Sequence, residues 1–485
     1  MPRGGKGKTM RTKLAVGATL AVGLTFLIAS PAVAQEVEVS NEALAEAGGY
    51  TQAVLDNLWV FIAGVLVFLM QAGFALVESG LTRAKNIGNI MAKNLADMAI
   101  GVLAFFIIGW TIAYGADGND WFGGFGDLFF QDSANGGAIN LIAGLDDDGN
   151  LVGVLSPATS FFFQVVFAAT AVTIASGAMA ERTKFVSYLV FSALMTAIIY
   201  PVVVHWTWGG GLIAQMNIGD AVYSDFAGSA IVHMTGGIAA FMGAMLLGPR
   251  LGKYDADGNP RAIPGHNIGF AVTGVFILWF GWFGFNAGSE LLADEFVPFV
   301  ALNTLLAAAA GVIGSTVVIW AKSKVPDVAM AANGALAGLV SITAPVGTVE
   351  PWAALLIGFI GGIIVVFAVL AIDRIRVDDP VGAIAVHGVC GIWGTLSIGL
   401  FAKYDDAFLG REDAGLFYGG GVDQLIMQAL MVLIIGAWVA ISSFLVFSAI
   451  KATIGLRVSE EEEMEGLDIR EHGTHGYGLE SANVG

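Results

Sequence analysis

The sequence predicts an all-α polytopic membrane protein with eleven transmembrane helices, arranged as two inverted five-helix repeats plus a final helix. Three observations support this fold class. The chain of 485 residues is 56% hydrophobic and only 13% charged, and apolar runs of about 20 residues, the length of a membrane-spanning helix, recur along it. Lys and Arg gather on one side of the predicted membrane. One nine-residue motif occurs twice, in segments that run in opposite directions.

The first 34 residues have the pattern of a secretory signal peptide. Five basic residues precede the apolar stretch 14–29, and Ala32-Val33-Ala34 matches a small-residue cleavage site. Cleavage there starts the mature chain near Gln35 and places its N-terminus outside. The alternative is an uncleaved additional helix.

The rest of the chain divides into a membrane domain, residues 35–454, and a cytoplasmic tail, residues 455–485. The repeat halves cover about 57–248 and 266–402, and the final helix covers about 423–451. An odd number of spans that begins outside ends in the cytoplasm. The eleven predicted spans are 57–78, 89–114, 158–181, 186–214, 227–248, 266–288, 296–321, 329–345, 351–372, 382–402 and 423–451.

The basic residues support this orientation, because inner loops of membrane proteins are enriched in Lys and Arg. Fifteen basic residues of the mature chain lie on or near the predicted inner side, against Lys403 and Arg411 outside. The outer loop 115–157 has several Asp but no Lys or Arg. An acidic outer face concentrates cations, although avoidance of basic residues in outer loops explains the same pattern. The inner residues are Arg83, Lys85, Lys93, Arg182, Lys184, Arg250, Lys253, Arg261, Lys322, Lys324, Arg374, Arg376, Lys451, Arg457 and Arg470.

The repeated motif is DFAGSAIVH at 225–233, which returns 154 residues later as DPVGAIAVH at 379–387. Asp, Gly, Val and His occupy identical offsets. Five predicted spans separate the copies, so they run in opposite directions. Eight helical residues rise about 12 Å, so from opposite faces of a core about 30 Å thick both His233 and His387 reach the midplane. This arrangement is typical of an inverted-repeat transporter or channel whose site lies where the halves meet.

Ionisable residues at that depth indicate function. We expect an imidazole–imidazole contact between His233 and His387, with both rings largely neutral because burial disfavours the charged form. Two His are also metal ligands in other proteins, but no third ligand with suitable spacing accompanies them. We therefore expect neither a metal nor a cofactor. The single Cys excludes an intramolecular disulfide.

Aromatic and polar residues converge on the predicted outer side. WTWGGG (206–211), GWFGFNAGS (281–289) and SFFFQVVF (160–167) all end or begin there. Aromatic faces attract cations, and a Ser hydroxyl accepts hydrogen bonds from N–H donors. Aromatic residues also anchor helices at membrane interfaces, so either role fits a single residue here. The candidate vestibule residues are Trp208, Phe163, Phe285 and Ser289.

These motifs together resemble the ammonium transporter family (Amt/Mep/Rh), in particular its bacterial Amt branch. The resemblance covers nearly all of the mature chain and rests on DFAGSAIVH, WGGG, GWFGFNAGS, AERTKF (180–185), VDDPVGAIAVHGVCGIWG (377–394) and GLRVSEEEEMEGLDIREHG (455–473). It implies the ammonium transporter fold and a homotrimer with one pore per subunit in the lipid bilayer of the bacterial inner membrane. It also implies that the tail packs against a neighbouring subunit, and that a PII-type regulatory protein plugs the inner mouth.

The resemblance also assigns roles to single residues. Trp208 and Ser289 match the outer ammonium site, which Phe163 lines. Phe163 and Phe285 match a stacked phenylalanine gate. Asp225 matches an outer-side Asp that is structural and aids deprotonation, although its position before a span also predicts a helix cap. The two repeat His match the twin-His pair of the pore.

The expected function is uptake of ammonium, with methylammonium as a further possible substrate. Ammonium would lose a proton near Asp225, ammonia would cross the hydrophobic twin-His pore, and the proton would cross separately, so that transport is electrogenic. Two alternatives remain open: a passive ammonia gas channel, and an ammonium sensor without significant transport. No nucleophile–base set or phosphate loop is evident in the sequence, so neither an enzyme nor a nucleic-acid-binding protein is expected.

Overall fold

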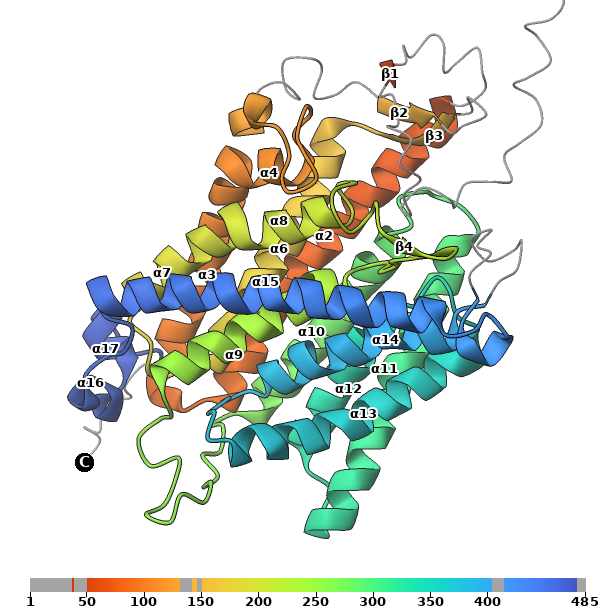
Figure 1. Ribbon diagram of the computed structural model, residues 1–485. Helices are drawn as coiled ribbons and strands as arrows, with labels where there is room; N and C mark the ends of the chain where they lie inside the picture. The colour runs from red at the N-terminus through yellow and green to blue at the C-terminus, as the bar shows by residue number, and fades with distance from the viewer. Residues whose placement is uncertain (1–36, 39–49, 131–141, 146–150, 404–413, 478–485) are drawn as a thin grey trace, which may run out of the picture.

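The computed structural model describes residues 37–38, 50–130, 142–145, 151–403 and 414–477. Within these residues, ten helical segments are long and apolar enough to cross a membrane, and they pack side by side as one bundle (Figure 1). The segments are α2 (Tyr50–Leu81); α3 (Ile87–Ala104) with η2 (Phe105–Gly109) and α4 (Trp110–Tyr114); α6 (Pro157–Ala178); α7 (Phe185–Leu194) with η4 (Met195–Ile199) and α8 (Tyr200–Trp206); η5 (Ser229–Met234) with α9 (Thr235–Leu247); α10 (Ile268–Trp282) with η6 (Phe283–Ala287); α11 (Phe296–Ser323); α13 (Pro351–Arg374); η7 (Ile384–Val389) with α14 (Cys390–Phe401); and α15 (Asp423–Thr453).

The eighth predicted span, 329–345, coincides with a shorter apolar helix, α12 (Val328–Thr343). Its 16 residues rise about 24 Å, less than the thickness of a typical hydrocarbon core. The helical class is confirmed, and a helix occupies each predicted span. The count of eleven transmembrane helices stays a prediction, because α12 falls short of the length needed to cross a bilayer unaided.

Short strands and turns lie in the connections between the helices. β1 (Val37–Glu38), β2 (Ile142–Leu145) and β3 (Leu151–Leu155) form an antiparallel sheet in that order, at the end of the bundle shown uppermost in Figure 1. A second antiparallel pair joins β4 (Asn217–Ile218) to β5 (Ala221–Val222). The remaining short helices of the connections are η1 (Ala84–Asn86), η3 (Phe125–Phe130) and η8 (Leu416–Tyr418).

Small residues allow the helices to approach closely. A Cβ atom on Gly358 of α13 would lie 2.1 Å from the carbonyl oxygen of Ala307 in α11, so no larger residue fits between these two helices. Dispersion contacts between such close backbones stabilise helix association in lipid, where burial of apolar surface contributes little. The high glycine content of the sequence therefore serves helix packing.

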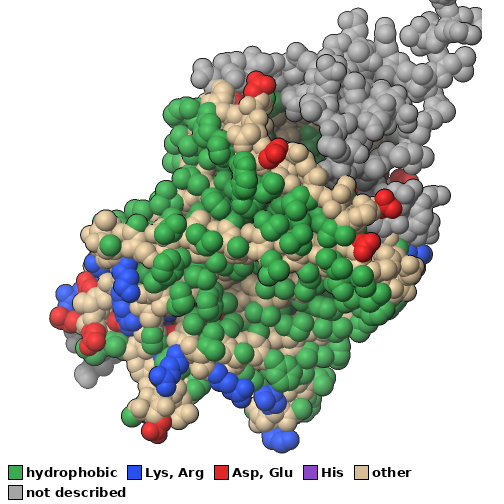
Figure 2. All heavy atoms as spheres, in the orientation of Figure 1, with side chains coloured by type: hydrophobic (Ala, Val, Ile, Leu, Met, Phe, Trp, Pro, Cys, Tyr) green, Lys and Arg blue, Asp and Glu red, His purple; other side chains and the backbone are tan. Residues whose placement is uncertain are grey.

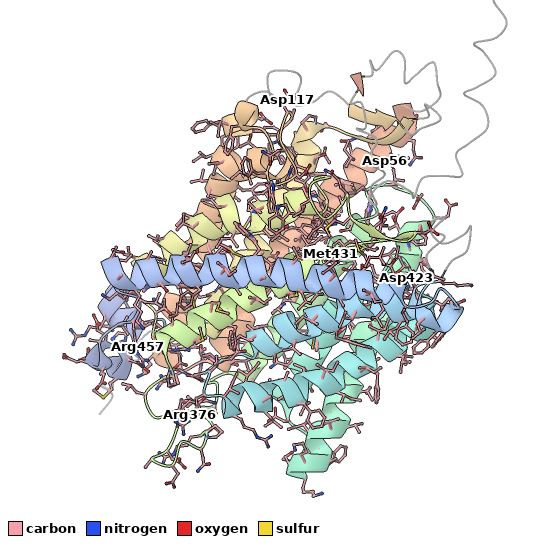
Figure 3. The ribbon with its side chains drawn as sticks, in the orientation of Figure 1. Asp56, Asp117, Arg376, Asp423, Met431 and Arg457 are labelled. Carbon is pink, nitrogen blue, oxygen red and sulfur yellow. The ribbon has the colours of Figure 1, made fainter. Side chains whose placement is uncertain are left out.

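The two ends of the bundle differ in charge. Figure 2 shows a broad apolar surface between an end with several Lys and Arg and an end with scattered Asp and Glu. In Figure 3, Arg376 and Arg457 lie at the first end, and Asp56 and Asp117 at the opposite one. This polarity is what the positive-inside rule requires. We call the basic end the inner end below; the orientation in a membrane, with the N-terminus outside, stays a prediction.

A buried ion network closes the inner end. The Arg250 guanidinium donates to both carboxylate oxygens of Asp378, at 2.8 and 3.0 Å, and Nη1 of Arg250 lies 3.4 Å from Glu181. Glu181 also pairs with Arg83, and Arg182 donates to the Asp378 carbonyl oxygen at 2.7 Å. Burial would raise the pKa of Asp378, but the hydrogen bonds and charge of Arg250 outweigh it and hold that pKa below its usual range.

The tail packs against the inner end of its own chain. It contains two short helices, α16 (Glu460–Glu465) and α17 (Leu467–His472). Asp468 accepts a hydrogen bond of 2.9 Å from the backbone N–H of Asn89, and the Glu463 carboxylate accepts one of 2.7 Å from the N–H of Leu251. The contact with a neighbouring subunit, implied by the resemblance, stays a prediction. The predicted signal peptide lies outside the described residues.

Candidate functional site

The two copies of the repeated motif cross inside the bundle. Each copy opens with one π-helical segment, η5 or η7, and continues as an α-helix, α9 or α14. A Cβ atom on Gly237 would lie 2.2 Å from the backbone nitrogen of Gly388, so the crossing requires glycine at this point. Because Gly388 directly follows His387, the close crossing also fixes the depth of that histidine.

The predicted imidazole–imidazole contact is present at the crossing. Nδ1 of His387 lies 3.2 Å from Nδ1 of His233, and both side chains are buried, with exposed fractions of 3% and 0%. Between neutral rings, this bond requires one Nδ1 to donate and the other to accept, so the two rings carry complementary tautomers. Nε2 of His233 is buried and has no hydrogen-bond partner among the described residues.

Aromatic rings pack against His233. Its ring stacks on Trp282 and Phe285, with centroid distances of 5.0 and 5.2 Å. Phe74 lies against His387, at 5.9 Å and tilted. The pair therefore presents few polar atoms between apolar walls, where a bare cation is strongly disfavoured and a small neutral molecule is accepted.

Asp225 caps the start of the first copy. One carboxylate oxygen accepts the N–H groups of Gly228 and Ser229, each at 2.8 Å. The other accepts those of Ala230 and Ile231, at 2.8 and 3.1 Å. Four amides at a helix start are thereby satisfied, as predicted for a cap. The carboxylate is almost fully buried, with an exposed fraction of 5%, so its negative charge acts in a medium of low dielectric constant.

Asp379 has the same geometry at the opposite end of the crossing. Its oxygens accept the N–H groups of Gly382, Ala383 and Ile384, at 3.1, 3.0 and 2.7 Å. Three residues after each Asp, the chain turns through a glycine with positive φ, 107° in Gly228 and 81° in Gly382, which other residues rarely adopt. The sequence repeat is therefore also a structural repeat of cap, glycine turn and buried His.

The candidate outer site is built from Trp208 and Ser289. The Trp208 indole N–H donates to the carbonyl oxygen of Asp225 at 3.1 Å, which ties the ring to the capped helix start. The Ser289 hydroxyl donates to the carbonyl oxygen of Phe285 at 2.8 Å. Because its hydrogen is used in that bond, its oxygen lone pairs remain to accept from a ligand. Phe163 lies beside Gly288, next to this serine.

The predicted stacking of Phe163 on Phe285 is wrong in one member, whereas the gate itself stays a prediction. Phe285 stacks on Phe167, with a centroid distance of 4.2 Å and an interplanar angle of 29°. Phe163 contacts Phe167 at 4.7 Å, one helical turn earlier on α6. The reason is the helix period: positions four apart share a face but differ in depth by about 6 Å, and Phe285 lies at the depth of Phe167. Trp208 also meets Phe167, at 6.1 Å and edge-on.

A small cavity lies on the inner side of the His pair. It is wide enough for a water-sized molecule, and its polar lining consists of His387, Glu78, Thr173 and Asn333. Apolar side chains, among them Phe74, form the rest of its wall. The outer aromatic site, the buried His pair and this cavity thus follow one another along the bundle.

Comparison with known proteins decides the family. The model of the Ammonium Transporter Family matches residues 58–477. The chain belongs to the ammonium transporter family.

Relatives of this family member come from distant organisms. The chain is 47% identical over 432 residues to ammonium transporter Amt2 of Archaeoglobus fulgidus, which covers 87% of this chain and 88% of that protein. It is 42% identical over 440 residues to ammonium transporter Amt1 of Haloferax mediterranei, covering 87% of this chain and 79% of that protein.

Solved structures of Amt and Mep proteins also match this chain. A sensor Amt protein matches with a TM-score of 0.78 and 37% identity, covering 87% of this chain and 99% of that one. Mep2 of Candida albicans matches with a TM-score of 0.76 and 27% identity, covering 88% of this chain and 93% of that one.

Sequence reasoning missed two residues of this ammonium transporter family member. Phe167 is part of SFFFQVVF, and its spacing of four from Phe163 signals that both lie on one helix face. The sequence does not show which of the two lies at the same depth as Phe285. Glu78 gives no signal in the sequence, because it stands in a common pattern of a charged residue near the end of a span. Only the packing of α2 against α6 shows that it is buried.

Proposed function

We propose that this family member imports ammonium by binding NH4⁺ at its outer mouth, removing one proton and conducting NH3 past the His pair. The observation that carries the proposal is the contact between His233 and His387, two buried imidazoles 3.2 Å apart between apolar walls. A neutral molecule with both N–H donors and a lone pair fits such a site. A bare cation does not, since its transfer to the middle of the membrane costs several kcal/mol or more.

Recognition begins at the outer aromatic site. The faces of Trp208 and Phe167 attract a cation, by up to about 2 kcal/mol when it is desolvated. The Ser289 oxygen accepts an N–H hydrogen bond from the bound ammonium. Phe163 lines the approach. Potassium satisfies the aromatic faces but has no N–H to donate, so the serine favours ammonium.

Deprotonation separates ammonium from potassium more strongly, because potassium has no proton to lose. Both oxygens of Asp225 already accept backbone N–H bonds, and direct protonation would break some of them. We therefore assign Asp225 an electrostatic role: its buried charge holds the cation at Trp208 while a proton leaves to water or to the His pair. The stacked rings of Phe167 and Phe285 then admit ammonia and exclude the hydrated cation.

The His pair conducts in two ways in this proposal. Ammonia binds along the rings, donating to one nitrogen and accepting from another. The proton crosses separately, by exchange of the complementary tautomers of His233 and His387, so one positive charge enters with each ammonia. Because the charge and the neutral molecule take separate steps, the pore rejects potassium and still carries net current.

A sensor function is the second candidate, because the chain is similar to a structure described as a sensor Amt protein, at 37% identity. Such a protein would bind ammonium at the same outer aromatic residues without rapid conduction. The third possibility, a passive ammonia channel, shares the pore and differs in moving no charge.

The assembly and location are proposed with the function. α2 exposes apolar side chains along its length, among them Leu58 at 51% and Phe68 at 51%, and these need either lipid or another subunit to cover them. We propose a homotrimer in a bacterial inner membrane, with the N-terminus outside and the tail in the cytoplasm. A PII-type protein at the inner mouth is proposed on the same resemblance.

The test is the current from proteoliposomes given ammonium pulses on a solid-supported membrane. Wild type should give a current that saturates with ammonium and is absent with potassium. The double variant His233→Ala/His387→Ala should lose the current or its selectivity, whereas His266→Ala, on the inner surface away from the pore, should behave as wild type. A silent wild type whose lumen turns alkaline would establish the neutral channel instead. If nothing crosses, the sensor function replaces transport.

A further inference from the structure

We propose that Glu78 forms an inner ammonium site, at which ammonia leaving His387 recombines with a proton and is held as NH4⁺ before release. The inference rests on the proposed function and adds a substrate-binding residue to it. The structure places a buried carboxylate and the inner histidine in the wall of the same small cavity.

The position of Glu78 suits an exit site. It lies three residues before the inner end of α2 at Leu81, about 5 Å from that end. Phe74, one turn earlier on the same helix, contacts the His387 ring at 5.9 Å. A molecule that passes His387 therefore meets Glu78 next, before it reaches the inner end of the bundle.

Glu78 has an unused binding atom. Its side chain is 2% exposed. Oε2 accepts the hydroxyl of Ser176 at 2.7 Å, and the Asn94 side chain also interacts with the carboxylate, but no donor lies within hydrogen-bond geometry of Oε1 in the part of the chain that the structure describes. A buried carboxylate oxygen without a donor costs free energy, and an N–H of bound ammonium supplies that donor.

The surrounding charges leave room for one more cation. Lys93 interacts electrostatically with Glu78 and Asp97 and, more weakly, with Arg182 and Glu181, so its charge is shared and not matched to Glu78 alone. Lys93 is itself held by the Ser176 carbonyl oxygen at 3.2 Å and by the ring of Tyr188 at 5.2 Å. Asp97 is satisfied by hydrogen bonds from Gln71 and Tyr188, at 2.6 and 2.7 Å. The carboxylate oxygen without a hydrogen-bond donor, Oε1, therefore belongs to Glu78, the residue that lines the cavity.

The cavity supplies the remaining ligands. The Thr173 hydroxyl and the Asn333 amide line it with Glu78. The hydroxyl of Thr173 donates to Asn94 at 3.0 Å, so its lone pairs remain to accept from a ligand. In the recombination step, NH3 takes the proton that arrives through His387 and becomes NH4⁺, so atoms and charge balance. The new N–H groups then bind the carboxylate and the hydroxyl.

The competing explanation is that Glu78 only balances the charge of Lys93. A charge-matched pair of variants separates the two roles. Glu78→Gln removes one of the two carboxylates that interact with Lys93 and changes the net charge of the group, whereas Glu78→Gln/Lys93→Met removes one charge of each sign and keeps the net charge. Ser443→Ala is the matched control, because it removes a buried hydroxyl of α15 that does not line the cavity.

We would measure saturating ammonium currents in proteoliposomes for these variants. We expect Glu78→Gln to lower the maximal current at least tenfold, with the half-saturating outer ammonium concentration within twofold of wild type. The double variant should stay as low, Ser443→Ala should stay near wild type, and Glu78→Asp should recover part of the current. If Glu78→Gln does not fold, the current of Glu78→Asp is the test, because this variant keeps the charge.

Two results would overturn the inner site: full current in Glu78→Gln, or full current in the Glu78→Gln/Lys93→Met double variant, which assigns Glu78 to charge balance alone. Both require a wild-type current, so they leave the proposed function standing. A wild type without ammonium current would instead refute the proposed function itself.

Discussion

Replacing Asp225 by Asn tests whether this carboxylate is mainly a helix cap. Its two oxygens accept four backbone N–H groups, two on each oxygen. An Asn carbonyl oxygen keeps one pair of these bonds, while its NH2 group faces the other pair as a second donor. Two buried amides then lack an acceptor, at about 1–3 kcal/mol each, so we expect a loss of about 2–6 kcal/mol in the free energy of unfolding.

Asp379→Asn is the matched comparison, because it removes the same charge from the equivalent position. Asp379 accepts two amides on one oxygen and a single amide, that of Ile384, on the other. Asn can keep the first pair and lose only the single bond, so the expected cost is about 1–3 kcal/mol. The partial exposure of Asp379 lowers it further, since water replaces the lost acceptor.

The assay is thermal unfolding of the purified proteins in one detergent, followed by intrinsic tryptophan fluorescence. Asp225→Asn should melt below Asp379→Asn, and both below wild type. If Asp225→Asn melts at the same temperature as wild type but carries no ammonium current, the capping argument fails and Asp225 has a chemical role in deprotonation. If Asp379→Asn is the less stable of the two variants, counting the lost amides is the wrong measure.

Three further predictions concern the gate and two carboxylates outside the membrane-spanning helices. Phe167→Ala should admit potassium current or raise methylammonium uptake, whereas Phe163→Ala should mainly raise the half-saturating ammonium concentration, because only Phe167 stacks on the opposite wall. Hydrogen bonds from Tyr418 and, to a lesser degree, from Lys403 and Trp352 lower the pKa of Glu350 to about 2. The stability that ionised Glu350 contributes should be complete above pH about 4.5 and should be lost as pH drops towards 2. Thermal melts of Glu350→Gln should lack this loss of stability in acid. Burial raises the pKa of Glu290 to about 9, so stability should decline as pH rises from about 4.5 to 9, and Glu290→Gln should melt higher than wild type at pH 8 but not at pH 4.

The helices and the His pair follow from patterns along the chain. Long apolar runs give the spans because a bilayer requires about 20 apolar residues and satisfied backbone groups. α13, for example, covers Pro351–Arg374, where the span 351–372 is predicted. The His contact follows from the repeat offset and the topology, since equal helical distances from opposite faces meet at the centre. Neither step needs tertiary contacts.

The gate and the inner cavity depend on contacts that sequence patterns do not contain. Phe163 and Phe167 share one face of α6, and only the register of α6 against η6 decides which of them meets Phe285. The burial of Glu78 likewise depends on how α2 lies against α6. Helix register in a membrane is set by small-residue contacts and van der Waals fit, and one turn of sliding exchanges neighbouring side chains without changing the hydrophobic pattern.

The inverted repeat makes the backbone of the pore symmetric, but its charges are not. At the outer end, Asp225 accepts hydrogen bonds from four amides and from the Tyr223 hydroxyl at 3.2 Å. No basic side chain pairs with it in the described ranges, and its neighbour is the aromatic ring of Trp208. At the inner end, Arg250 pairs with Asp378, and the capping Asp379 interacts electrostatically with Arg182 and Arg250. A cation is therefore attracted to the outer copy and not to the inner cap, so inward release needs a separate carboxylate beyond the His pair. Glu78 is the residue that fills that need, which is why the inner site completes the pathway.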